Sequence, residues 1–118
     1  MGRAVLIVDD DASFRNLAGR ILKSWGHDVV GEAGSVAEAL AQASELRPDT
    51  VLADIGLPDG DGFELARQLL STGPSLRVVL ISSDSDSANG PAALRVGAEG
   101  FFPKDELSEA AFRAWVDG

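Results

Sequence analysis

Short apolar runs alternate along this chain with segments in which apolar residues recur every three or four positions. Residues 4–8 are continuously apolar, which is typical of a parallel strand covered on both faces. Residues 14–25 then carry apolar side chains at the spacing of one helix face, and Gly26 is a suitable stop. The same alternation continues to the end of the chain. It predicts strands at 4–8, 28–32, 50–53, 78–81 and 100–102, and helices through 14–25, 35–46, 63–70, a short one opening at Gly90-Pro91, and a last one carrying Leu107, Ala111, Phe112 and Trp115.

Strict alternation of strands and helices indicates an α/β fold with a parallel sheet and helices on both faces. Right-handed crossovers leave few possible topologies for such a sheet. The 118 residues suffice for one core, and the chain has no linker or repeat, so residues 1–118 are expected to form one domain. The segment 28–32 is the weakest strand and is expected at an edge, whereas residues 82–89 read as a polar loop.

The composition excludes several classes of function. The net charge is −9 and the ten Lys and Arg residues are scattered, which opposes nucleic-acid binding by this domain and docking on anionic membranes. Cysteine is absent, which excludes disulfides, thiolate nucleophiles and cysteine-based zinc sites and fits a cytoplasmic location. The apolar runs are too short to span a bilayer.

Acidic residues stand where two of the expected strands end. Asp9 and Asp10 follow the first strand, and Asp54 follows the third. Because parallel strands bind ligands beyond their carboxyl ends, these three carboxylates are expected to meet at one edge of the sheet. Like charges that close are unfavourable unless a cation joins them, so the simplest interpretation is a divalent metal site. Ser82 and Lys104 end the fourth and fifth strands at the same edge.

Taken together, the strand-end segments resemble those of response-regulator receiver domains, over essentially the whole chain. The matching segments are Val8-Asp9-Asp10, Asp54-Ile55-Gly56-Leu57-Pro58 with Asp61-Gly62, Ser82-Ser83, and Gly97 through Lys104. The resemblance implies a flavodoxin-like, five-stranded parallel sheet in the order 2-1-3-4-5.

The resemblance also implies a signalling switch rather than a turnover enzyme. In this family Asp54 would accept a phosphoryl group from a phosphohistidine on a sensor histidine kinase or a histidine phosphotransfer protein. Phosphorylation would change the surface of the fourth helix, fifth strand and fifth helix, and with it partner binding or dimerisation. The implied Mg²⁺ ligands are Asp9, Asp10, Asp54 and the backbone carbonyl of Gly56; Ser82 and Lys104 would bind the phosphoryl group, and Phe101 would move with it.

Three features depart from the usual family pattern. Lys104 is followed by Asp105 instead of proline, a variant frequent in regulators with helix-turn-helix output domains, which favours a DNA-binding output domain outside this chain. Gly56 and Asp84 occupy the positions that tune phosphoryl loss, and a glycine there is expected to leave the phosphoryl group exposed and short-lived. Gly90-Pro91 is expected to shorten the fourth helix.

Two other functions compete with this interpretation. A haloacid-dehalogenase-like phosphatase would use Asp9 as nucleophile, but the chain continues with Ala12-Ser13 where that family has Gly-Thr or Gly-Val, and Asp54 stays unexplained. A degenerate receiver would act only as a docking module. Among the remaining residues, Asp11 is expected to cap the first helix, His27 to lie exposed in a loop, and Trp25 and Trp115 to pack against the core or a helix face.

Overall fold

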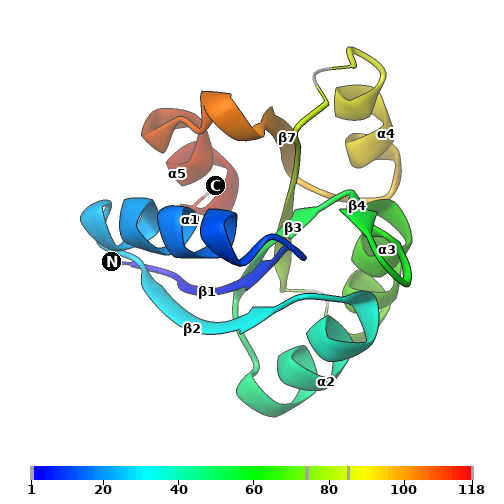
Figure 1. Ribbon diagram of the computed structural model, residues 1–118, viewed down its shortest axis with the longest axis horizontal. Helices are drawn as coiled ribbons and strands as arrows, with labels where there is room; N and C mark the ends of the chain where they lie inside the picture. Colours follow the sequence, from blue (N-terminus) through cyan, green and yellow to red (C-terminus); the bar gives the residue numbers. More distant parts are fainter. Residues whose placement is uncertain (1, 74, 85, 118) are drawn as a thin grey trace.

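A computed structural model describes residues 2–73, 75–84 and 86–117. A central sheet is covered by helices on both faces, and the chain runs back and forth between sheet and helix (Figure 1). The elements are β1 (Ala4–Val8), α1 (Ala12–Ser24), β2 (Asp28–Ala33), α2 (Val36–Leu46), β3 (Thr50–Asp54), β4 (Gly56–Leu57), β5 (Gly60–Asp61), α3 (Gly62–Thr72), β6 (Arg77–Ser82), α4 (Asn89–Arg95), β7 (Gly100–Pro103), the 3₁₀ helix η1 (Lys104–Glu106) and α5 (Glu109–Asp117).

The main sheet has five parallel strands in the order β2-β1-β3-β6-β7. Counting only these strands along the chain, the order is 2-1-3-4-5, so the expected flavodoxin-like topology is confirmed. The register sets Val8 beside Ala53, and Asp54 beside Ile81. This alignment brings the carboxyl ends of β1, β3 and β6 to one edge.

Two apolar clusters hold the helices onto the sheet. Side chains from one face of the strands pack with α1 and α5, and those from the other face pack with α2, α3 and α4. The two layers are visible on opposite sides of the sheet in Figure 1. The strand residues Val5–Val8, Val51–Ala53 and Val78–Ile81 are fully buried, which explains why these segments are apolar without alternation.

Helix caps follow the sequence closely at three N-termini. The Asp11 carboxylate accepts from the backbone N–H of Ser13 (2.9 Å), so the predicted cap of α1 is confirmed. Ser35 Oγ accepts from the Glu38 N–H in α2 (3.1 Å), and Asp61 Oδ1 accepts from the Glu64 N–H in α3 (2.8 Å). These caps fix the loops that lead from the sheet edge into the helices.

The antiparallel pair β4–β5 is a small hairpin directly after Asp54. In its turn, both oxygens of Asp59 accept from the first backbone N–H groups of α2, Val36 at 2.7 Å and Ala37 at 3.0 Å. These hydrogen bonds hold the pKa of Asp59 below its usual range. The hairpin is therefore tied to a neighbouring helix. The sequence did not predict it, because its two-residue strands have no periodicity.

The other differences between the predicted and the observed structure are small, with one exception. α4 is short, as expected, but begins at Asn89; α5 begins at Glu109, so Leu107 lies ahead of it while packing on the same cluster. Gly73 caps α3 at its C-terminus, and Pro74 lies outside the described residues. Trp25 and Trp115 are half-buried against the α1–α5 cluster, which confirms their predicted packing role.

The exception is His27, which is buried and not an exposed loop residue. Gly26, at a φ of 91°, turns the chain sharply after α1 and directs His27 inward. Its ring lies edge-on to Phe112 of α5, with centroids 5.2 Å apart, and Nδ1 accepts from the Arg3 N–H (2.9 Å). This packing depends on α5, which the local sequence around His27 cannot report.

In the described part of the chain, each helix is too short or too polar to cross a bilayer.

Candidate functional site

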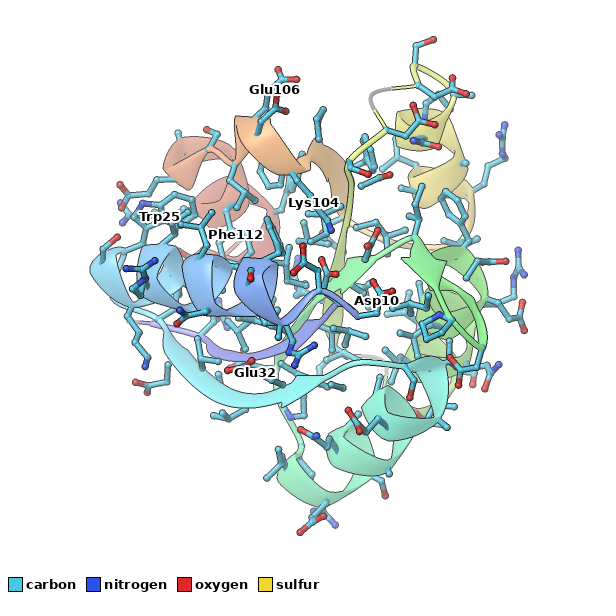
Figure 2. The ribbon with its side chains drawn as sticks, viewed as in Figure 1. Asp10, Trp25, Glu32, Lys104, Glu106 and Phe112 are labelled. Atoms are coloured by element: carbon cyan, nitrogen blue, oxygen red, sulfur yellow. The ribbon has the colours of Figure 1, made fainter. Side chains whose placement is uncertain are left out.

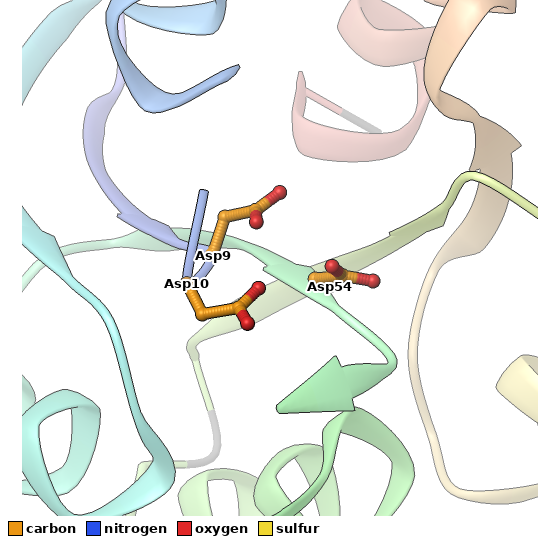
Figure 3. A group of neighbouring side chains, drawn as sticks. All are labelled: Asp9, Asp10 and Asp54. Carbon is orange, nitrogen blue, oxygen red and sulfur yellow. The ribbon is translucent and has the colours of Figure 1, made fainter. Parts of the chain in front are cut away.

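Three carboxylates converge where β1 and β3 end. Asp9 and Asp10 follow β1, Asp54 is the last residue of β3, and each offers an oxygen within 4.8 Å of the others. Figure 3 shows the three side chains close together at the ends of these strands. The convergence expected from the sequence is thus present.

The three acids differ in their access to solvent. Asp9 is fully buried and Asp54 is 7% exposed, whereas Asp10 is exposed. The cluster therefore has a closed side at Asp9 and an open side at Asp10. A small ion or a reacting group can reach Asp54 from the open side.

Lys104 supplies the positive charge of the cluster. Its Nζ lies 2.6 Å from Asp9 Oδ2 and 3.2 Å from Asp54 Oδ2. The side chain extends from the start of η1 toward the acids (Figure 2). Lys104 thus pairs with two of the three carboxylates, and the excess negative charge of the cluster is one that a divalent cation would balance.

The pKa values of the buried pair reflect these surroundings. Burial raises the pKa of Asp9 above its ordinary value, although the hydrogen bond with Lys104 acts against this. Burial alone would lower the pKa of Lys104, but its hydrogen bond to Asp9 and the charge of Asp54 outweigh that effect, so its pKa is raised. Lys104 is therefore protonated at neutral pH.

Backbone hydrogen bonds orient the buried carboxylates. Asp9 Oδ1 accepts from the Asp11 N–H (2.9 Å), and Asp54 Oδ1 accepts from the Gly56 N–H (3.1 Å). In both residues Oδ2 is left to face Lys104. The loop after each strand thus fixes how its carboxylate points.

Arg15 of α1 braces the loop that carries the first two acids. Its Nη1 donates to the backbone carbonyl of Asp9 (2.5 Å), while Nε pairs with Glu32 on the edge strand β2 (3.0 Å). No residue pattern predicts this role of Arg15, because its partner is a main-chain oxygen.

The remaining predicted residues make other contacts. Ser82 ends β6, is 6% exposed, and accepts from the Asp84 N–H through Oγ (3.0 Å). It follows Ile81, which is paired with Asp54 across the sheet. Phe101 of β7 is half-buried against the α2–α4 cluster, and Asp84 is exposed. A Cβ atom added at Gly56 would meet nothing within 4 Å, so the space beside Asp54 is open there.

The donor set fits a hard divalent cation. Carboxylate oxygens are the ligands that Mg²⁺ prefers, and Mg²⁺ usually retains several waters beside one or two carboxylates. Two of the three carboxylates sit on fixed loops, and the third faces solvent. This acidic pocket therefore fits Mg²⁺ and an aspartyl phosphate.

Over nearly its whole length this chain is similar to known proteins. Residues 5–115 match the family model described as response regulator receiver domain. The DNA-binding transcriptional activator DevR/DosR of Mycobacterium tuberculosis is 41% identical over 99% of this chain, which spans 54% of that relative's length. The chemotaxis protein CheY of Thermotoga maritima is 34% identical over 88% of this chain and 87% of its own length.

The same likeness holds in three dimensions. The signal receiver domain of the response regulator NarL from Mycobacterium tuberculosis superimposes with a TM-score of 0.86 and 35% identity, covering 98% of this chain and 94% of that domain. The sheet order, the acidic strand ends and the full-length match agree with one another. This chain belongs to the response regulator receiver domain family.

Proposed function

We propose that this domain is a phosphorylation-dependent switch in which Asp54 accepts a phosphoryl group from a phosphohistidine of a partner protein. The observation that carries the proposal is the position of Asp54, between two further carboxylates and a protonated lysine at an edge open to solvent. The donor would be a sensor histidine kinase or a histidine phosphotransfer protein.

In the proposed transfer, a carboxylate oxygen of Asp54 forms a bond to phosphorus while the bond from phosphorus to the imidazole nitrogen breaks. The electron pair of the broken bond returns to the imidazole. Asp9, Asp10, Asp54 and the backbone carbonyl of Gly56 would hold Mg²⁺, which when bound supplies positive charge that offsets repulsion between donor and acids. The chain's own contribution is mainly positioning and electrostatics.

Lys104 and Ser82 would bind the phosphoryl oxygens. Lys104 already lies 3.2 Å from Asp54, so a small movement of its flexible side chain brings it to a phosphoryl group there. Ser82 stands next to the strand partner of Asp54, and its hydroxyl can donate once the loop after β6 moves inward. The space vacated would let Phe101 turn, which couples the site to the surface of α4, β7 and α5 as a shift between two populations.

The phosphatase alternative finds less support. It needs Asp9 as nucleophile, and Asp9 is fully buried and paired with Lys104 at 2.6 Å. Asp54 is the less tightly held of the two carboxylates. We therefore propose a signalling switch and not a turnover enzyme. Phosphorylation and dephosphorylation of Asp54 are the two steps that turn this switch on and off.

A phosphodonor experiment tests the proposal. Acetyl phosphate with Mg²⁺ should add one phosphoryl group to the wild type, and peptide mapping should locate it on Asp54. Asp54→Asn and chelation by EDTA should each abolish the labelling. Asp11→Asn is the matched control, because it removes a neighbouring acid whose role is to cap α1 and should still be labelled. Modification of Asp9 would favour the phosphatase, and no modification at all would favour a docking module.

The lifetime of the phosphoryl group is proposed to depend on Gly56 and Asp84. Open space beside Gly56 would admit water to the acyl phosphate, so Gly56→Met should slow its decay. Gly90→Ala offers a control, since a Cβ there also meets nothing within 4 Å but lies on α4. Decay in Gly56→Met that is unchanged or faster would contradict this part of the proposal.

The output is proposed to lie outside this chain. The chain spans about half of a relative described as a DNA-binding transcriptional activator, which supports a longer regulator with a DNA-binding domain. Phosphorylation-dependent dimerisation and a cytoplasmic location stay predictions.

A further inference from the structure

An aromatic ring lies against the lysine of the acidic cluster. Phe14, in the first turn of α1, has its ring centroid 4.6 Å from Lys104 Nζ, inside the distance at which a ring face attracts a cation. The two residues come from opposite ends of the chain. Phe14 is 9% exposed and belongs to the α1–α5 apolar cluster. As a core residue it needs only to be apolar, so its contact with the ammonium group calls for a separate account.

The position of Lys104 explains why a neutral partner is useful. Lys104 follows β7 at the start of a three-residue 3₁₀ helix, and its long side chain has many conformations to lose. Its ion pairs are with Asp9 and Asp54, both members of the acid cluster. A further acid would hold the lysine but would add to the repulsion among three carboxylates. A ring face attracts the ammonium group without adding net charge.

The Phe14 ring takes no part in the proposed chemistry at Asp54. If Asp54 becomes phosphorylated, the oxygens that face Lys104 change, whereas the Phe14 ring does not take part in the reaction. Phe14 therefore offers a constant partner before and after transfer.

We propose that Phe14 is a positioning residue that holds the Lys104 ammonium group over the acid cluster, where it meets the phosphoryl group. This inference rests on the proposed function. It requires an aromatic face at position 14 and not simply apolar volume. Phe14→Leu should therefore slow phosphoryl transfer to Asp54 roughly 3- to 30-fold, the range of a lost cation–π contact. Phe14→Trp, which keeps a ring face, should stay within a few-fold of the wild type.

The control for packing is Phe112→Leu. Phe112 is fully buried in the same cluster but contacts Trp25 and His27. This variant should lose stability yet keep the wild-type rate of labelling with acetyl phosphate, measured below its unfolding temperature. Equal slowing in Phe14→Leu and Phe112→Leu would assign the effect to core packing and overturn the proposal.

A spectroscopic readout separates this inference from the proposed function. In ¹H–¹³C spectra the Lys104 ε protons should be shifted upfield by the Phe14 ring current, and Phe14→Leu should remove that shift. If wild type is not labelled at Asp54, the proposed function fails and takes the inference with it, even where the shift is present. If wild type is labelled and Phe14→Leu is labelled equally fast, the inference alone fails.

Discussion

Asp9 and His27 are both buried titratable residues, one beyond the carboxyl end of β1 and the other before the amino end of β2. In both, burial disfavours the charged form: it raises the pKa of Asp9 and lowers the pKa of His27. By burial alone the two are equivalent candidates for a functional site.

Their surroundings differ. Asp9 lies beside the adjacent Asp10 and close to Asp54 and Lys104, which come from two other segments of the chain. His27 meets the edge-on ring of Phe112 and one backbone N–H. The charges of Asp117, Arg113, Arg3 and Asp49 also act on its pKa, but less than its burial does. The comparison shows that convergent charged groups mark the site, whereas a single buried polar group is part of the core.

The largest effect is expected from removing the cation of the cluster. Lys104→Gln leaves Asp9 buried without its ion-pair partner and should lower the free energy of unfolding by about 3 kcal/mol at neutral pH. Urea denaturation measures this, with Lys23→Gln on the exposed side of α1 as control. Saturating Mg²⁺ should restore part of the loss, since an ion that binds only the folded cluster stabilises it. A loss no larger than that of the control would mean that the cluster holds little charge.

Replacing His27, at the amino end of β2, should change the free energy of unfolding less, and this change should depend on pH. His27→Gln should cost about 2 kcal/mol through lost packing against Phe112. Because the folded-state pKa of His27 is lowered, the stability that neutral His27 contributes is present above its ordinary pKa. It is lost as the pH falls through the folded-state value. The difference between wild type and variant in urea melts should therefore shrink from pH 7.5 to pH 5. A difference that stays constant would show that His27 does not titrate in this range.

The smallest change in the free energy of unfolding is expected for Asp9→Asn, and it should be an increase. The folded-state pKa of Asp9 is raised, so its contribution to stability is full below its ordinary pKa and is lost as the pH rises through the folded value. Asp9→Asn should therefore raise the free energy of unfolding at neutral pH in the absence of Mg²⁺, by less than Lys104→Gln lowers it. The same variant should lose most of the stabilisation that Mg²⁺ gives to wild type. Thermal melts with and without Mg²⁺ decide this, and a destabilised variant would contradict it.

A residue's position can be predicted from the sequence where it depends on nearby residues and on the order of the strands. Asp9, Asp54 and Lys104 were placed correctly because each ends an apolar run, and a parallel sheet aligns such ends at one edge. The order of the strands followed from the family resemblance. The position of the site therefore needs little more than strand boundaries and topology.

The features that were missed depend on contacts between distant segments. His27 is buried by a helix near the other end of the chain, and Asp59 in the turn of the β4–β5 hairpin holds the hairpin to α2. Phe14 fits the same helical spacing as the other apolar residues on the inner face of α1. The sequence therefore does not distinguish Phe14, which contacts Lys104, from residues that only pack in the core. Such residues become visible only when tertiary neighbours are known.

The central claim is that the carboxylates at the edge of the sheet form one Mg²⁺ site around Asp54. Titration of Mg²⁺ into ¹⁵N-labelled protein tests it directly, because each backbone amide reports its own surroundings. The amide signals of Asp9, Asp10, Asp54 and Gly56 should move along one saturable curve that Asp10→Asn weakens, while that of His27 stays in place. Signals at the four positions that do not move, or that move equally in Asp10→Asn, would contradict the account.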